Sequence, residues 1–249
     1  MFYANNWLYF FDNFDRAASA RSHPENPDAP AFRPVVPLPC RLLSRRPRSR
    51  PALLQVNFRG SCGRGVTFME AGYREYGGKM MNDLIDGVKW ANARADIDAA
   101  RVCVFGASFG GYAALMLPVR APTMFKCTVG YSGRYDLAAR YDEEAFKGKT
   151  RATNYLIKTV GNDPAMLASS SPTMLAEQIK IPVLLVHGSK DKTTELPQAE
   201  KMRDALIKAG HPAEWVLEKY EDHGFYDSEH RKQFYQRLEA FLAKYIGPK

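Results

Sequence analysis

A serine flanked by glycines is the residue of this chain best suited to covalent chemistry. Residues 106–111 contain the pattern G-x-S-x-G, with Ser108 at its centre. The apolar residues 102–105 precede it, and the helix-like residues 112–117 follow. A strand, a glycine-flanked serine and a helix form the context of a nucleophile elbow, where a sharp turn exposes the serine hydroxyl. Glycine-rich turns without any chemistry share this short pattern, so further residues must support it.

An aspartate and a histidine follow later strands. Asp191 comes after the apolar residues 181–186, and His223 comes after the alternating residues 213–218. A serine hydroxyl is a weak nucleophile and needs an adjacent base. Imidazole can take and return that proton, and a carboxylate fixes its tautomer. The order Ser, Asp, His is that of an α/β-hydrolase triad, so we predict Ser108 as nucleophile, His223 as general base and Asp191 as its orienting carboxylate.

Two other carboxylates compete with Asp191 for the histidine. Asp222 adjoins His223 in sequence, and neighbours on a loop rarely face each other, so Asp191 is preferred. Asp136 follows the strand after the elbow, and we interpret it as a helix cap.

Three further residues have chemically capable side chains. Ser132 imitates an elbow but lacks a following apolar helix, so it is interpreted as a turn residue. His187 ends an apolar strand and is interpreted as structural. Arg59 follows a core strand, where substrate binding and loop bracing both stay open.

The bulk composition predicts one globular α/β domain. The chain has 249 residues, of which 45% are hydrophobic and 25% charged, as in soluble globular proteins. No apolar stretch approaches the roughly 20 residues that span a bilayer. The aromatic residues 2–14 lack a basic start, so we interpret them as a packed segment and not as a signal peptide. We expect a cytoplasmic location, with export left open.

The four cysteines match no metal-ligand spacing. Cys103 and Cys127 fall in predicted core strands, where we expect free thiols that behave as small hydrophobes. Free thiols are typical of a reducing compartment. We expect no metal and no cofactor.

The net charge of +8 has a local origin. Residues 31–50 contain six arginines and no acidic residue, whereas the rest of the chain has 29 basic and 27 acidic residues. A basic arm that binds polyanions is one alternative, but no nucleic-acid motif accompanies it. We therefore expect neither a nucleic-acid partner nor a membrane partner.

The chain is organised in two parts. Residues 1–51 are interpreted as an irregular segment, because residues 24–51 hold eight of the sixteen prolines and are rich in arginine. Residues 52–249 alternate strands and helices, which predicts a mainly parallel sheet covered on both faces. Residues 134–180 lack clear strands, and we expect helices and loops there, over the carboxyl edge of the sheet where ligands bind.

The expected elements follow from the apolar pattern. The predicted strands are residues 52–58, 101–105, 125–130, 181–186 and 213–218. The predicted helices are residues 79–95, 112–117, 195–209 and 229–245.

From about Leu53 onward the chain resembles the catalytic domain of the prolyl oligopeptidase family of serine peptidases, in its acylaminoacyl-peptidase and dipeptidyl-peptidase-like branch. The matching stretches are residues 55–61, 76–84, 106–112, 135–137, 182–191 and 222–225. The resemblance implies an α/β-hydrolase fold with Ser108, Asp191 and His223 as the catalytic triad. It also implies that the backbone N–H of Phe109 is one oxyanion donor.

Two departures from the family pattern stand out. We expect no N-terminal β-propeller of the kind with which the family restricts its substrates, and this expectation favours a broad esterase as an alternative. The family also places a His-Gly-Gly-Pro-type turn at the end of a central strand, where it supplies the second oxyanion donor. This sequence has no such turn, so a catalytically impaired hydrolase is a further alternative.

That central strand has two candidates in this chain. Residues 34–40 contain three prolines, each of which removes a ladder donor. The aromatic residues 7–11 are the other candidate. The abrupt composition of residues 24–51 also suggests a stretch translated in a shifted reading frame, which the coding DNA would test. We expect a serine hydrolase acting on peptides or small esters, and we leave its oligomeric state open.

Overall fold

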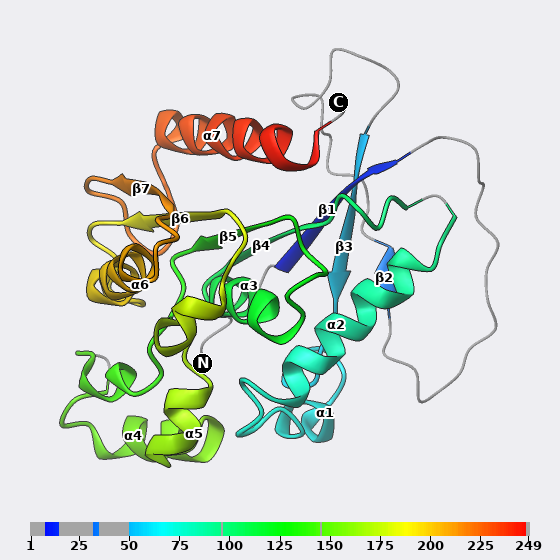
Figure 1. The fold of residues 1–249 in the computed structure, drawn as a ribbon. Helices are drawn as coiled ribbons and strands as arrows, with labels where there is room; N and C mark the ends of the chain where they lie inside the picture. The colour runs from blue at the N-terminus through cyan, green and yellow to red at the C-terminus, as the bar shows by residue number, and fades with distance from the viewer. Residues whose placement is uncertain (1–7, 15–31, 35–49, 96, 145, 248–249) are drawn as a thin grey trace.

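The computed structural model describes residues 8–14, 32–34, 50–95, 97–144 and 146–247. Within these residues, seven strands form one sheet in the order β2-β3-β1-β4-β5-β6-β7 (Figure 1). Helices pack on both faces of this sheet, as the strand–helix alternation predicted.

The second half of the sheet is parallel. It contains β4 (Cys103–Ala107), β5 (Cys127–Tyr131), β6 (Val183–Gly188) and β7 (Glu214–Glu218). Every residue of β5 and β6 is buried, as expected for parallel strands covered on both faces. The carboxyl ends of all four strands therefore lie at the same edge.

The first half of the sheet is antiparallel. The strand β1 (Leu8–Phe14) lies between β3 (Arg50–Val56) and β4 and runs antiparallel to both. The aromatic run thus fills the central position, and Leu8 pairs with Gly106. The proline-containing β2 (Phe32–Pro34) pairs only with β3, at the edge of the sheet, where a proline is tolerated. Residues 35–40 of the other candidate strand lie outside the described residues.

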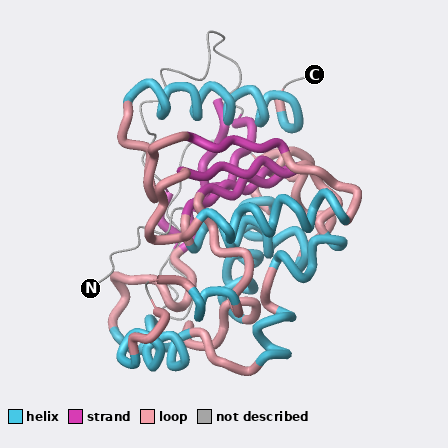
Figure 2. Tube along the Cα trace, turned by 90° about the vertical axis from the view of Figure 1, so that its left-hand side faces the viewer, coloured by secondary structure: helices cyan, strands magenta, loops and turns pink. Residues whose placement is uncertain are grey.

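Two hydrophobic cores cover the two faces of the sheet. The larger core packs α2 (Lys79–Asn92), α3 (Phe109–Arg120) and α6 (Leu196–Lys208) against one face. On the other face, α7 (Ser228–Ile246) buries Phe234, Leu238 and Phe241. Figure 2 shows α7 alone above the strands and the other helices below them.

Short helices occupy the segments that carry no strand. They are α1 (Val66–Glu70), α4 (Thr150–Thr159), α5 (Pro164–Ser169) and the 3₁₀ helices η1 (Ala139–Asp142) and η2 (Pro172–Gln178). Helices and loops also make up the described part of residues 134–180, which confirms the prediction for that segment. In Figure 1, α4 and α5 lie together at the end of the molecule opposite α7.

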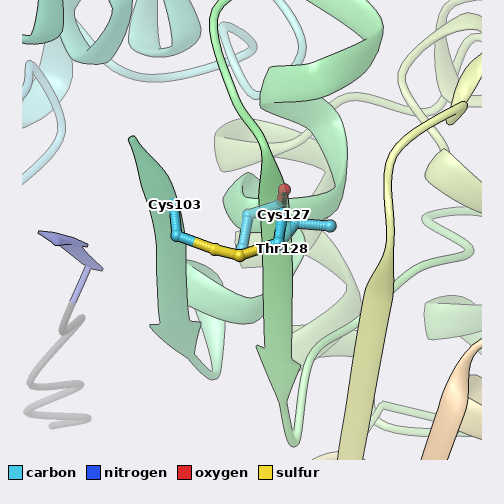
Figure 3. The surroundings of a disulfide bond; sticks show 4 residues. Cys103, Cys127 and Thr128 are labelled. Atoms are coloured by element: carbon cyan, nitrogen blue, oxygen red, sulfur yellow. Dashed lines mark hydrogen bonds between the residues drawn. A yellow bond between two sulfur atoms is a disulfide. The ribbon is translucent and has the colours of Figure 1, made fainter. Parts of the chain in front are cut away.

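The prediction that Cys103 and Cys127 are free thiols is wrong, because the structure joins these two residues in a disulfide (Figure 3). The two residues occupy matching positions on the neighbouring parallel strands β4 and β5, with their Cα atoms 4.8 Å apart. A Cα separation of this size permits a disulfide. Cys62 is an exposed free thiol.

No helix in the described residues is long and apolar enough to cross a membrane.

Candidate active site

The backbone around Ser108 forms the sharp turn that its glycines predicted. The residue stands between the end of β4 and the start of α3, with φ 57° and ψ −116°. Few residues with a side chain adopt this conformation, and it stores strain. A Cβ at Gly106 would lie 2.2 Å from the carbonyl carbon of Gly110, so both ends of the turn touch. The Ser108 N–H donates to the Tyr131 carbonyl at 2.9 Å, which ties the turn to β5.

Phe109 opens α3 directly after Ser108. The first N–H groups of a helix have no acceptor inside it and carry a partial positive charge. The Phe109 ring is held by Phe58, stacked at 5.0 Å, and by Tyr76, edge-on at 5.2 Å. This packing fixes the backbone of Phe109 beside the serine.

Asp191 and His223 form a hydrogen-bonded pair. The His223 Nδ1 lies 2.9 Å from the Asp191 Oδ2, and the Asp191 side chain is fully buried. The Asp191 Oδ1 accepts the backbone N–H groups of Thr193 at 2.9 Å and Thr194 at 2.7 Å. Burial raises the pKa of the Asp191 carboxyl, but the hydrogen bonds from His223 and Thr194 and the charge on His223 hold that pKa below its ordinary value. The carboxylate is therefore kept ionised and fixed in orientation.

His187 closes the other side of this carboxylate. Its side chain is fully buried, with Nε2 at 2.9 Å from the Thr194 carbonyl and 3.6 Å from the Asp191 Oδ2. Burial lowers the pKa of His187, so the imidazole is neutral near pH 7. It supports the loop that carries Asp191, as its structural interpretation predicted.

The loops that carry Asp191 and His223 are bound to each other. The Asp222 Oδ1 accepts the N–H of Lys192 at 3.0 Å and the N–H of His223 at 2.8 Å. The Lys190 N–H donates to the Glu221 carbonyl at 2.8 Å. Asp222 thus joins the two loops through their backbones, whereas Asp191 contacts the imidazole, as preferred from the sequence.

Glu221 is a buried carboxylate that sequence analysis missed. It accepts the N–H groups of Tyr226 at 2.7 Å and Asp227 at 3.0 Å, and its Oε1 lies 2.7 Å from the His230 Nδ1. These bonds hold the end of the His223 loop against the start of α7. In the sequence, Glu221 differs from Asp222 only in standing one residue further from His223, and this position does not show which of the two carboxylates is buried.

Ser108, Asp191 and His223 follow β4, β6 and β7, whose carboxyl ends share one edge of the sheet. Within the described part of the chain, a hydrogen bond joins His223 to Asp191, and none joins the Ser108 hydroxyl to His223. The arrangement places a serine hydroxyl, an imidazole and a buried carboxylate on three loops of one edge.

Two of the three remaining sequence candidates have hydrogen-bond partners for their side chains, and the third, Ser132, has none for its hydroxyl among the described residues. Arg59 forms a two-pronged ion pair with Asp83, at 2.7 Å from Nε to Oδ2 and 2.6 Å from Nη2 to Oδ1, so it braces its loop. The Asp136 Oδ1 accepts the N–H of Ala139, the first residue of η1, at 3.0 Å, although the N-cap position of η1 is Ala138. Ser132 is fully buried at a positive φ of 46°.

The wall opposite Phe109 differs from the family pattern. In the family pattern, the strand beside β4 ends near the serine and supplies the second oxyanion donor from the turn that follows. Here β1 runs in the opposite direction and begins near the serine, with Leu8 opposite Gly106. Residues 1–7 lie outside the described residues, so the second oxyanion donor is unassigned.

A cavity of about 250 Å³ lies in the segment expected to form the substrate pocket. Its lining includes Tyr141, Leu167 and Met174 and contains none of the three triad candidates.

The fold and the elbow place the chain among the α/β-hydrolases. A model of the prolyl oligopeptidase family matches residues 51–249, and the chain belongs to that family. The resemblance seen in the sequence is thereby confirmed.

Two curated relatives illustrate the match. Dipeptidyl aminopeptidase BIII of Pseudoxanthomonas mexicana is 35% identical over 208 residues, which cover 79% of this chain and 29% of the relative. Dipeptidyl peptidase family member 6 of Caenorhabditis elegans is 30% identical over 204 residues, which cover 79% of this chain and 27% of the relative. The chain spans less than a third of the length of each.

Solved structures share the fold. A puromycin-hydrolyzing peptidase of Mycobacterium tuberculosis has a TM-score of 0.71 at 26% identity, covering 79% of this chain and 30% of that one. An acylaminoacyl peptidase of Pyrococcus horikoshii has a TM-score of 0.71 at 21% identity, covering 79% of this chain and 32% of that one. The predicted α/β-hydrolase fold is confirmed.

Proposed function

We propose that this chain is a serine hydrolase that cleaves peptide bonds through an acyl-enzyme on Ser108. The observation that carries the proposal is the strained turn at Ser108, at the sheet edge where Asp191 and His223 are hydrogen-bonded at 2.9 Å. The relatives named as dipeptidyl aminopeptidase and acylaminoacyl peptidase favour peptides as substrates.

The proposed reaction has two halves. His223 takes the proton of the Ser108 hydroxyl as its oxygen attacks the substrate carbonyl. The backbone N–H of Phe109 stabilises the negative oxygen that forms, and Asp191 stabilises the imidazolium. The C–N bond breaks as His223 returns the proton to the leaving amine. Water, deprotonated by His223, then attacks the acyl-enzyme and releases Ser108.

Two alternatives to the peptidase are each supported by an argument. A broad carboxylesterase is compatible with the same triad, because ester and amide cleavage share the acyl-enzyme. A catalytically impaired hydrolase is favoured by β1, whose start lies where the family strand would end. Loss of one oxyanion donor costs about 10²–10³ in turnover, so that alternative predicts slow turnover by an activated serine.

Initial rates on two substrate classes test the proposal. Aminoacyl and dipeptidyl p-nitroanilides report amide cleavage, and p-nitrophenyl butyrate reports ester cleavage. We expect both to be cleaved by the native protein and neither by the Ser108→Ala variant. Equal rates for the native protein and the Ser108→Ala variant would refute catalysis by Ser108. Cleavage of the ester alone would favour the esterase alternative.

The remaining features are also proposals. We assign residues 52–249 to the catalytic domain and residues 1–51 to an N-terminal segment, and we leave oligomer formation open. We keep a cytoplasmic location as a proposal, because residues 2–14 lack the basic start of a signal peptide. Export stays open, and the Cys103–Cys127 disulfide favours it, because disulfides are rare in reducing compartments.

A further inference from the structure

Arg140 is linked to the elbow through the side chain of Tyr76, and none of the described carboxylates forms an ion pair with it. Its Nη1 donates to the Tyr76 hydroxyl at 3.3 Å. The Tyr76 ring packs edge-on against the Phe109 ring, with 5.2 Å between their centres. Phe109 follows Ser108 directly, so only two contacts separate the guanidinium of Arg140 from the residue next to the serine.

The Arg140 guanidinium is fixed in place but has unused donors. It lies over the Phe146 ring, 5.1 Å from the ring centre, which holds its plane. Its Nε is buried and has no hydrogen-bond acceptor. A guanidinium has five N–H donors, and buried donors are nearly always paired. The unpaired Nε therefore calls for an acceptor that the described residues do not supply.

A second arginine, Arg134, lies near Arg140. The Arg134 Nε pairs with the Glu143 Oε2 at 3.2 Å, and the other oxygen of Glu143 accepts from Gln198 at 3.0 Å. Burial lowers the pKa of Arg134, and the charge of Arg140 lowers it further. The two arginines thus repel each other, and Glu143 is already bound by other partners.

The charge of Arg140 also acts on Tyr155, a residue at the protein surface. Burial raises the pKa of the Tyr155 hydroxyl, and the charge of Arg140 opposes this effect. Tyr155 is 57% exposed, and Arg140 itself is half-buried. Part of the Arg140 side chain is therefore exposed to solvent.

We propose that Arg140 binds a carboxylate of the peptide substrate close to the bond that Ser108 cleaves. A guanidinium binds a carboxylate through two parallel N–H···O bonds, which would use the donors left unpaired here. The carboxylate belongs either to an acidic side chain or to the C-terminus of a short peptide. This proposal rests on the proposed function, because it places the substrate at Ser108.

Peptide binding to the Ser108→Ala variant tests the proposal without turnover. Three fluorescent peptides of one sequence are compared by anisotropy: one with an internal Glu and an amidated end, one with Gln and an amidated end, and one with Gln and a free carboxyl end. We expect at least one carboxylate peptide to bind about tenfold more tightly than the amidated Gln peptide, the size of a charge-assisted hydrogen bond in a half-buried site. The peptide that gains affinity identifies the carboxylate.

A second substitution links this preference to Arg140. In the Ser108→Ala background, Arg140→Gln should abolish the preference and leave the affinity of the amidated Gln peptide unchanged, which also shows that the site is folded. The matched control is Arg237→Gln, which removes an exposed arginine that pairs with Glu214 on the far side of the sheet. It should keep the preference.

Several results would overturn the proposal. They are equal binding of the three peptides, no binding of any peptide, and a preference that survives Arg140→Gln or is lost equally in Arg237→Gln. Failure of the proposed function would be seen separately, as the absence of Ser108-dependent cleavage of p-nitroanilides and esters.

Discussion

Replacement of Ser108 by glycine should stabilise the protein while abolishing its activity. The residue has φ 57° and ψ −116°, a conformation that glycine adopts freely and residues with a Cβ do not. Alanine at the same position removes the hydroxyl but keeps the Cβ. The difference between the Ser108→Gly and Ser108→Ala variants therefore isolates the backbone strain of the elbow.

The magnitude follows from two opposing effects. A residue held in such a conformation costs about 1–3 kcal/mol. Glycine also lowers the free energy of unfolding by about 0.4–1 kcal/mol, because its unfolded chain has greater conformational entropy. The free energy of unfolding of Ser108→Gly should exceed that of Ser108→Ala by about 1–2 kcal/mol. For a chain of this length, the melting temperature should rise by about 2–8 °C.

Urea and thermal unfolding, followed by circular dichroism, measure this difference. The control pair is Ser228→Gly and Ser228→Ala, because Ser228 is the exposed first residue of α7. There the glycine variant should be the less stable of the two. A Ser108→Gly variant that is no more stable than Ser108→Ala would refute a strained elbow at Ser108.

Three further predictions concern Asp191 and Gln198. Asp191→Asn should lower kcat/KM for p-nitroanilides by roughly 10³–10⁴, because the amide no longer stabilises the imidazolium; a loss below tenfold would contradict its role. The folded-state pKa of Asp191 lies below its ordinary value of 3.8, so the stability it contributes is present above pH 3.8 and is lost as the pH falls through the folded pKa. The difference in melting temperature between the native protein and Asp191→Asn should therefore shrink below pH 3.8, and a difference that grows in acid would show the opposite sign. Gln198 accepts the buried N–H groups of Tyr135 at 3.0 Å and Asp136 at 2.9 Å, so Gln198→Leu should cost about 2–4 kcal/mol of unfolding free energy in urea, and a cost below 0.5 kcal/mol would refute this account.

The parallel half of the sheet could be predicted from the sequence because its signals are local. The strands β5 and β6 are short apolar runs that are buried on both faces, and the structure starts each within two residues of its predicted position. The elbow could also be predicted, since its glycines are required by contacts inside one turn, such as that between Gly106 and Gly110.

Pairing between distant segments could not be predicted from local pattern. The aromatic run was one candidate for the central strand, but nothing in its composition set its antiparallel direction or the pairing of Leu8 with Gly106. Likewise, the apolar pattern placed Cys103 and Cys127 in the core, whereas their disulfide depends on the register between β4 and β5. The contacts of Glu221 with the start of α7 have the same long-range origin.

The site of covalent labelling tests the central claim most directly. A fluorophosphonate reacts with serines whose hydroxyl is activated by a base, and it needs no knowledge of the natural substrate. We predict one adduct, located by mass spectrometry on Ser108 in the native protein and absent from the His223→Ala and Ser108→Ala variants. An unlabelled Ser108, or labelling that persists without His223, would contradict the catalytic site proposed for this chain.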